Sequence, residues 1–193
     1  LNDKENEMLK VLYITGYKNF ELGVFDNKAK EVAFIKKGIQ KRLENLIEEG
    51  LEWVIISGQL GVELWAGEAV IELKQTYPEL RLAILPPFLQ HESNWNDKNK
   101  EYYLAIVSQA DFVQPVSNQP YVNPIQFKNR DQFVLNKTDG ALIFYDDEKE
   151  GSPQYFWKKA REHAQSHKYE VMQISFYDIQ QIIEEAVYEH NND

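Results

Sequence analysis

Short apolar segments alternate with longer amphipathic segments along almost the whole chain, and this alternation limits the available folds. Strands are predicted over residues 9–15, 51–57, 80–85, 111–116, 140–145 and 169–174. A chain that alternates strands with helices joins parallel strands through right-handed crossovers. The near-continuous apolar character of several segments fits strands that are covered on both faces. The pattern therefore predicts an α/β fold with a doubly wound, mostly parallel, Rossmann-like sheet and helices on both faces.

The helices between these strands are indicated by apolar residues at steps of three and four. Val32, Ile35, Ile39 and Leu43 form such a stripe within a helix predicted over 27–49, which Gly50 ends. Further helices are predicted over residues 62–76, 99–109, 126–135, 153–166 and 177–190.

The length of 193 residues suits one domain, and no repeat or linker divides the chain. We expect a single domain over 8–193, preceded by a disordered polar leader at 1–7 that lacks the layout of a signal peptide. The chain has no cysteine, so disulfides and thiolate chemistry are excluded. No apolar run approaches the length of a membrane span. A cytoplasmic protein without membrane attachment is expected.

The formal net charge of −10 disfavours binding to nucleic acid, whose phosphates would be repelled. Lys36, Lys37, Lys41 and Arg42 are close in sequence, but glutamates flank them. This cluster favours a solvated helix face over a contact with a phosphate backbone.

Ligands of open parallel sheets bind at the carboxyl ends of the strands, so segments that directly follow strands are candidate sites. The first is Ser57-Gly58-Gln59-Leu60-Gly61-Val62-Glu63. Its glycines permit close backbone approach, and amides at a helix start favour an anion. Ser57 adds a hydroxyl donor, and Glu63 could accept hydrogen bonds from ribose hydroxyls. The alternative is an ordinary strand-to-helix turn.

The second candidate segment is Thr15-Gly16-Tyr17-Lys18, after the first strand. Gly16 would allow close approach of a ligand, Tyr17 could stack on a base, and Lys18 could bind phosphate. Alternatively, Tyr17 caps the core and Lys18 is solvated. The spacing from Gly16 to Gly23 does not match the dinucleotide-binding fingerprint, so NAD is not indicated.

The third candidate segment, Gly151-Ser152-Pro153, follows the fifth strand. Ser152 and Pro153 are typical of a helix start, and the same position would direct helix amides at a ligand. No metal site is predicted, because the spacing of His163 and His167 does not match a zinc-protease motif.

Three segments, residues 14–25, 56–66 and 145–153, resemble the YpsA family of Gram-positive bacteria. That family belongs to the SLOG group of Rossmann-like domains, whose relatives include DprA and the LOG-type hydrolases. The resemblance implies a nucleotide or a nucleotide derivative as ligand, for example an ADP-ribose-like molecule. It also implies a role linked to cell division and stress, and it brings no established reaction.

Two motifs of these relatives, one from DprA-like proteins and one from LOG-type hydrolases, bear on the expected function. DprA-like proteins carry Arg-Asn-Arg where this chain has Arg130-Asp131-Gln132, so Arg130 keeps a guanidinium for phosphate while the lost positive charge disfavours nucleic acid. The Pro-Gly-Gly-x-Gly-Thr-x-x-Glu motif of LOG-type hydrolases is absent. We therefore expect a ligand-sensing protein, with a hydrolase that uses Glu63 on an N-glycosidic bond as the alternative. A scaffold with a vestigial pocket is the third possibility. The sequence does not decide whether the protein forms a homo-oligomer.

Overall fold

The computed structural model describes residues 8–191, so the predicted leader at 1–7 lies outside the described residues. Within this range, six strands form one sheet in which all neighbouring strands are parallel. Their order is β4-β3-β2-β1-β5-β6. The strands are β1 (Val11–Gly16), β2 (Trp53–Ile56), β3 (Arg81–Ile84), β4 (Phe112–Val113), β5 (Gly140–Phe144) and β6 (Glu170–Ile174). The predicted fold class is confirmed.

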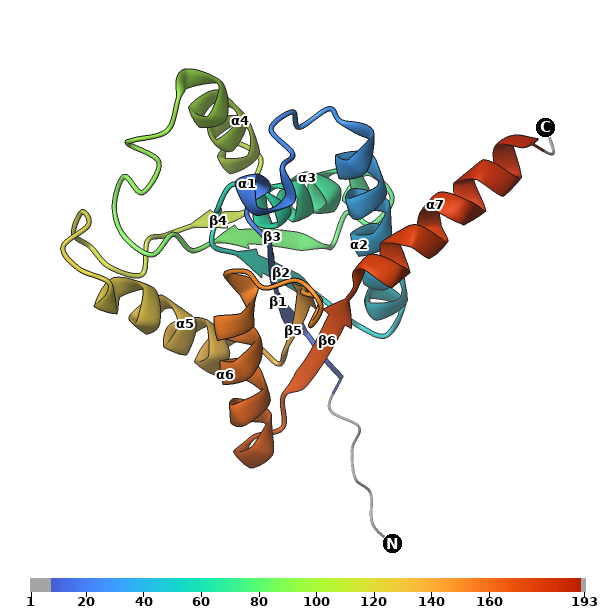
Figure 1. Ribbon diagram of the computed structural model, residues 1–193. Helices are drawn as coiled ribbons and strands as arrows, with labels where there is room; N and C mark the ends of the chain where they lie inside the picture. Colours follow the sequence, from blue (N-terminus) through green and yellow to red (C-terminus); the bar gives the residue numbers. More distant parts are fainter. Residues whose placement is uncertain (1–7, 192–193) are drawn as a thin grey trace, which may run out of the picture.

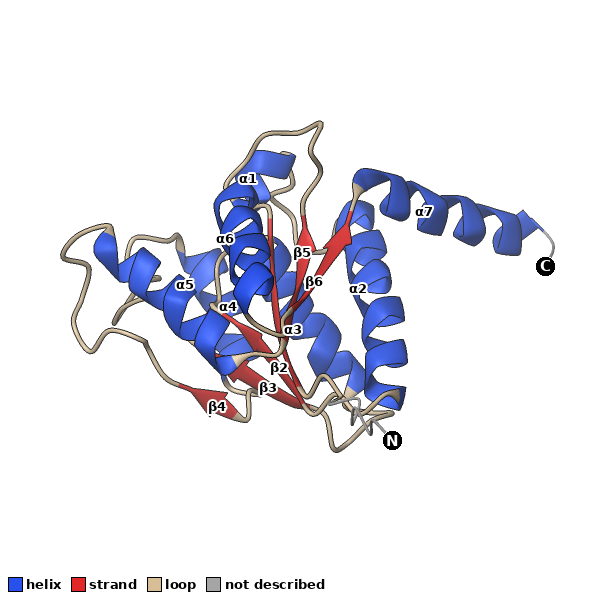
Figure 2. Cartoon of the chain, turned by 90° about the horizontal axis from the view of Figure 1, so that it is seen from below, coloured by secondary structure: helices blue, strands red, loops and turns tan. Residues whose placement is uncertain are grey.

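Helices cover both faces of this sheet (Figures 1 and 2), with α5 and α6 on one face and α2 and α3 on the other. The predicted helices form, and a one-turn helix, α1, was not predicted because four residues are too few to show a periodic pattern. The helices are α1 (Asn19–Leu22), α2 (Lys30–Glu48), α3 (Val62–Leu73), α4 (Asp97–Val107), α5 (Ile125–Lys137), α6 (Pro153–Ser166) and α7 (Phe176–Asn191).

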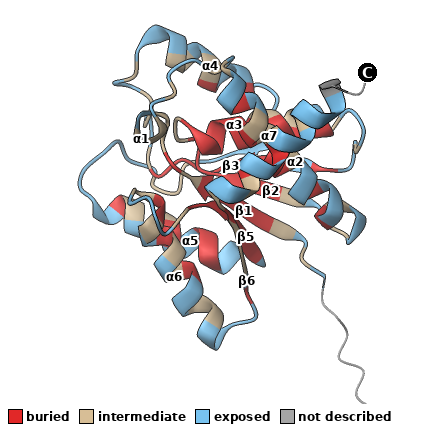
Figure 3. Ribbon diagram, turned by 45° about the vertical axis from the view of Figure 1, so that its right-hand side comes forward, coloured by how far each residue is buried: buried red, intermediate tan, exposed pale blue. Residues whose placement is uncertain are grey.

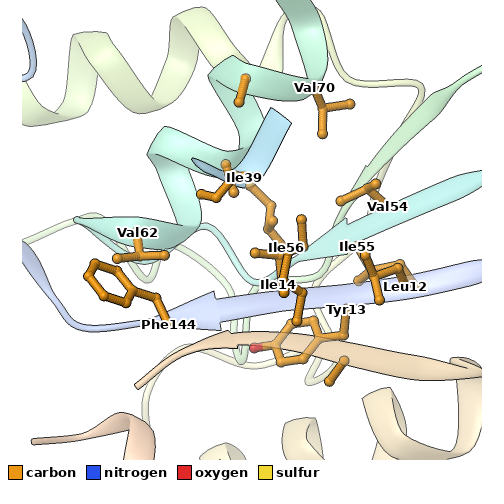
Figure 4. Close-up of a cluster of buried hydrophobic side chains, with 14 of the residues drawn as sticks. Leu12, Tyr13, Ile14, Ile39, Val54, Ile55, Ile56, Val62, Val70 and Phe144 are labelled. Carbon is orange, nitrogen blue, oxygen red and sulfur yellow. The ribbon is translucent and has the colours of Figure 1, made fainter. Parts of the chain in front are cut away.

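The core lies on both faces of the central strands, where the residues are almost fully buried (Figure 3). Side chains alternate between the faces along each strand. Ile14 and Ile56 gather with Ile39 of α2 and Val62 of α3 (Figure 4), and each of these four side chains is at most 1% exposed. Tyr13 points to the opposite face, where its ring meets Phe156 of α6.

The basic cluster of α2 pairs with acidic side chains of neighbouring helices. Lys36 contacts Glu68 and Glu72 of α3, while Lys41 and Arg42 pair with Glu185 and Asp178 of α7. Lys41 and Arg42 are about half exposed, which fits the predicted solvated helix face, but Lys36 is only 16% exposed. In residues 8–191, none of the helices has both the length and the hydropathy that a bilayer crossing requires.

The strand order reverses between β1 and β5, because β2, β3 and β4 extend to one side of β1 and β6 extends from β5 to the other. Such a switch point leaves a crevice at the carboxyl ends of the two strands. The loop after β1 and the start of α6 both reach this place, so the fold brings two predicted segments together.

Candidate functional site

A cavity of about 520 Å³ opens at this switch point. Its walls come from the end of β1, the β2–α3 turn, and helices α5 and α6. The volume falls within the range of sites for small molecules. Aromatic side chains from three elements line it, namely Tyr13, Phe127, Tyr155 and Phe156.

The charged side chains that line the cavity are mainly basic. Four are cationic, Lys18, Lys128, Arg130 and Lys159, and two are acidic, Glu63 and Asp131. The whole chain carries a net charge of −10, so the cavity has the opposite sign to the rest of the molecule. A concave basic site of this kind attracts anions.

Arg130 of α5 has an unused hydrogen-bond donor. Its Nε donates to Asp131 Oδ1 at 2.9 Å, but Nη1 is buried and has no hydrogen-bond partner. Burial by itself would lower the pKa of Arg130, yet the neighbouring oxygens of Tyr13 and Asp131 outweigh this effect and raise it. A buried cationic donor without a partner is costly, and an anionic ligand in the cavity would satisfy it once the side chains that cover Nη1 move aside.

Asp131 holds two of the cavity's cations in place. Its Oδ1 accepts from Arg130, and its Oδ2 accepts from Lys159 Nζ of α6 at 3.3 Å. The side chains of Arg130 and Asp131 are each 13% exposed, so both are fixed by packing as well as by hydrogen bonds. The Asp131 carboxylate thus joins α5 to α6.

Glu63 is a buried carboxylate whose two oxygens each accept two hydrogen bonds from the protein. The hydroxyls of Tyr13 and Thr15 donate to Oε1 at 3.0 and 2.8 Å. The backbone amides of Ser57 and Gln59 donate to Oε2 at 3.1 and 2.9 Å. Glu63 is 4% exposed. A carboxylate has about four acceptor sites, so Glu63 is saturated and ties the β2–α3 turn to β1.

In the turn after β2, Gln59 lines the cavity, whereas Ser57, Gly58 and Gly61 do not. Ser57 is fully buried, and its hydroxyl bonds to the Tyr13 phenol at 3.1 Å. A Cβ on Gly58 would meet Tyr103 and His91, and His91 Nε2 lies 3.1 Å from the Gly58 carbonyl. Burial lowers the pKa of His91, which leaves a neutral ring able to donate through Nε2.

The β1–α1 loop and the β5–α6 loop are joined by buried polar contacts. Tyr17 is fully buried, and its phenol donates to the Lys149 carbonyl at 2.7 Å. Glu21 accepts from the Ser152 amide and hydroxyl at 2.6 and 2.8 Å. Burial raises the pKa of Glu21, but these hydrogen bonds outweigh burial and lower it. Ser152 directly precedes α6, as predicted. Its hydroxyl donates to Glu21 and does not cap the helix.

The structure divides the sequence-predicted site residues into two groups. Thr15, Gly16, Lys18, Gln59, Glu63, Arg130 and Ser152 line the cavity. The fully buried Tyr17, whose ring packs on Phe144 and Phe176, does not line it, and neither do Ser57, Gly58, Gly61 or Gly151.

Apart from Arg130, sequence reasoning missed the cavity residues that α5 and α6 contribute. Tyr155, Phe156 and Lys159 recur at steps of three and four along α6, and Phe127, Lys128 and Asp131 do so along α5. That spacing was the available signal, since it places these residues on one helix face.

Comparison with known proteins shows the family. A family model described as the YspA SLOG family, YpsA, matches residues 12–179. The UPF0398 protein YpsA of Bacillus subtilis is 47% identical over 180 residues, which cover 93% of this chain and all of that protein. A UPF0398 protein of Brevibacillus brevis is 47% identical over 186 residues and covers 96% of this chain and 99% of its own length.

Among solved structures, DNA processing protein A from Helicobacter pylori, described for its single-stranded DNA binding mode, has a similar fold. The TM-score is 0.50 at 15% sequence identity, with 92% of this chain and 81% of that chain covered. At this identity the likeness extends to the fold alone. The family match and the full-length relatives together show that this chain belongs to the YpsA family of SLOG proteins.

Proposed function

We propose that the protein binds a phosphate-bearing, nucleotide-like small molecule in the basic cavity and acts as a ligand sensor. The observation that carries this proposal is the buried Arg130 Nη1, which has no partner in the described residues. A phosphate oxygen would satisfy this donor once the side chains that cover it move aside, and Lys128 and Lys159 would add charge around the same group.

The aromatic lining supports a ligand that also carries a ring. Phe127 projects from α5 and Tyr155 from α6, so rings flank the cavity from two helices. Tyr155 is 69% exposed, which leaves a ring face available at the mouth. Planar bases stack on such rings. The cavity thus combines cations for a phosphate with aromatic surface for a base.

The phosphate contact is proposed for side chains rather than for the amides of the glycine turn. The amides of Ser57 and Gln59 already donate to Glu63. The amides of Val62 and Leu64, at the start of α3, donate to the carbonyls of Tyr17 and Gln59. These amide N–H groups are already engaged, whereas Arg130 Nη1 has no acceptor among the described residues.

Replacing Arg130 by glutamine is expected to weaken the binding of AMP or ADP-ribose by about 10- to 150-fold, the equivalent of a hydrogen bond to a charged group. Isothermal titration calorimetry at fixed salt measures this change. Arg42→Gln is the matched control, because Arg42 pairs with Asp178 outside the cavity and its loss should leave affinity unchanged. Equal affinities of wild type and Arg130→Gln for every probe would contradict the proposal.

The alternative function, cleavage of an N-glycosidic bond, rests on the position of the Glu63 carboxylate in the cavity lining. We expect neither wild type nor Glu63→Gln to release free base from a panel of nucleoside monophosphates, because four protein donors already occupy the carboxylate. Chromatography of the incubated panel is the measurement. Base release by wild type that Glu63→Gln abolishes would assign the hydrolase instead.

A further inference from the structure

A second cavity, of about 460 Å³, lies at the β2–β4 end of the sheet and shares no lining residue with the basic cavity. Ile55, Ala83 and Leu85 form its floor, and Phe133 of α5 stands on its wall. The two cavities lie along the same helix, since the earlier turns of α5 line the basic cavity and Phe133 and Lys137 line this one.

The floor of this second cavity is buried and its mouth is exposed. Ile55, Ala83 and Leu85 are 7%, 4% and 5% exposed, while Phe112 and Phe133 are 46% and 39% exposed. Burying an apolar group against such a surface is favourable in proportion to the area removed from water. The cavity is therefore suited to an apolar body that enters between the two phenylalanine rings.

Cations stand at the rim of this apolar cavity. Lys137 lines it and places Nζ 5.8 Å from the centre of the Phe133 ring. The guanidinium of Arg81 lies 5.7 Å from the centre of the Trp53 ring, another lining residue. Of the described residues, no carboxylate lines the cavity, and the neighbouring Asp111 accepts from Lys74 Nζ and the Leu82 amide.

We infer that this second cavity binds a small apolar carboxylic acid. Its hydrocarbon part packs on Ile55 and Ala83, and its carboxylate faces Lys137 at the rim. Charge complementarity selects this occupant, because a rim that offers cations and no carboxylate favours an anionic head over a neutral one. The site is separate from the basic cavity, so it is independent of the function proposed above.

Octanoate and 1-octanol form a matched pair of probes, since they share the hydrocarbon chain and differ in charge. We expect saturable binding of octanoate to wild type by calorimetry, with weaker binding of 1-octanol. Lys137→Gln should weaken octanoate by about two- to fivefold, as for a solvent-exposed ion pair, and leave 1-octanol unchanged.

Two variants test the position of the site. Ala83→Leu fills the floor and should abolish the binding of both probes. Phe133→Asp, at a partly exposed position that tolerates a polar residue, places a negative charge at the mouth and should weaken octanoate more than 1-octanol. Phe25→Asp is the control, because Phe25 is 67% exposed and lines neither cavity.

Three results would overturn the inference. The first is the absence of saturable octanoate binding to wild type. The second is binding that stays unchanged in both Ala83→Leu and Phe133→Asp. The third is a doubled mass of wild type in light scattering that Phe133→Asp returns to a monomer, because a second copy of the chain would then cover this face.

Discussion

Gly61→Ala is expected to destabilise the protein by about 3–6 kcal/mol, because backbone strain and overpacking add. Gly61 has φ 102°, a conformation that L side chains rarely adopt. An added Cβ would lie 2.6 Å from the Tyr17 carbonyl oxygen, which already accepts from the Val62 amide. The methyl would therefore push α3 away from the loop after β1. Urea unfolding measures the loss, which is a large part of an ordinary domain's stability.

Gly23→Ala separates the two causes. Gly23 also has a positive φ, 67°, but among the described residues, its two chain neighbours aside, none comes within 4 Å of the position that a Cβ would take. Its replacement should lower the free energy of unfolding only by the strain of a left-handed alanine, about 1–2 kcal/mol. A Gly61→Ala variant that loses no more stability than Gly23→Ala would show that the close approach at Gly61 can relax, and the expected overpacking between α3 and the loop after β1 would be wrong.

The fold could be predicted because its signals are local. The helix over 27–49 was visible from an apolar stripe that one helix face must bury, and α2 forms there. The strand at 140–145 was visible as a continuous apolar run, and all five residues of β5 are buried. Helix α1 lacked any such signal, since its four residues are held by the surrounding loops and none of them is buried.

The site was predicted only in part, because residue type and position do not fix the direction of a side chain. Ser57 and Glu63 were correctly placed after β2, but the sequence does not show that Tyr13 and Thr15 meet them from β1. Lys159 enters the cavity because α6 packs beside α5, a relation between helices that no local pattern contains. Arg130 was indicated by the family resemblance alone.

Glu63→Leu is expected to lower the free energy of unfolding by about 2–6 kcal/mol. The variant leaves the buried amides of Ser57 and Gln59 without an acceptor, at about 1–3 kcal/mol for each. The hydroxyls of Tyr13 and Thr15 also lose their acceptor, although a hydroxyl can turn toward another group. Urea unfolding followed by circular dichroism measures the effect.

Glu63→Gln is the conservative comparison, and it distinguishes a positioning role from direct ligand contact. The glutamine oxygen can accept from the two amides, while its NH₂ donates to the hydroxyls of Tyr13 and Thr15 after they turn. We therefore expect Glu63→Gln to keep most of the stability that Glu63→Leu loses, and to bind AMP or ADP-ribose as wild type does. Stability retained together with a tenfold or greater loss of affinity would mean that the carboxylate charge itself meets the ligand. In that case the ligand must displace one of the four protein donors, and those of Tyr13, Thr15 and Gln59 belong to residues that line the cavity with Glu63.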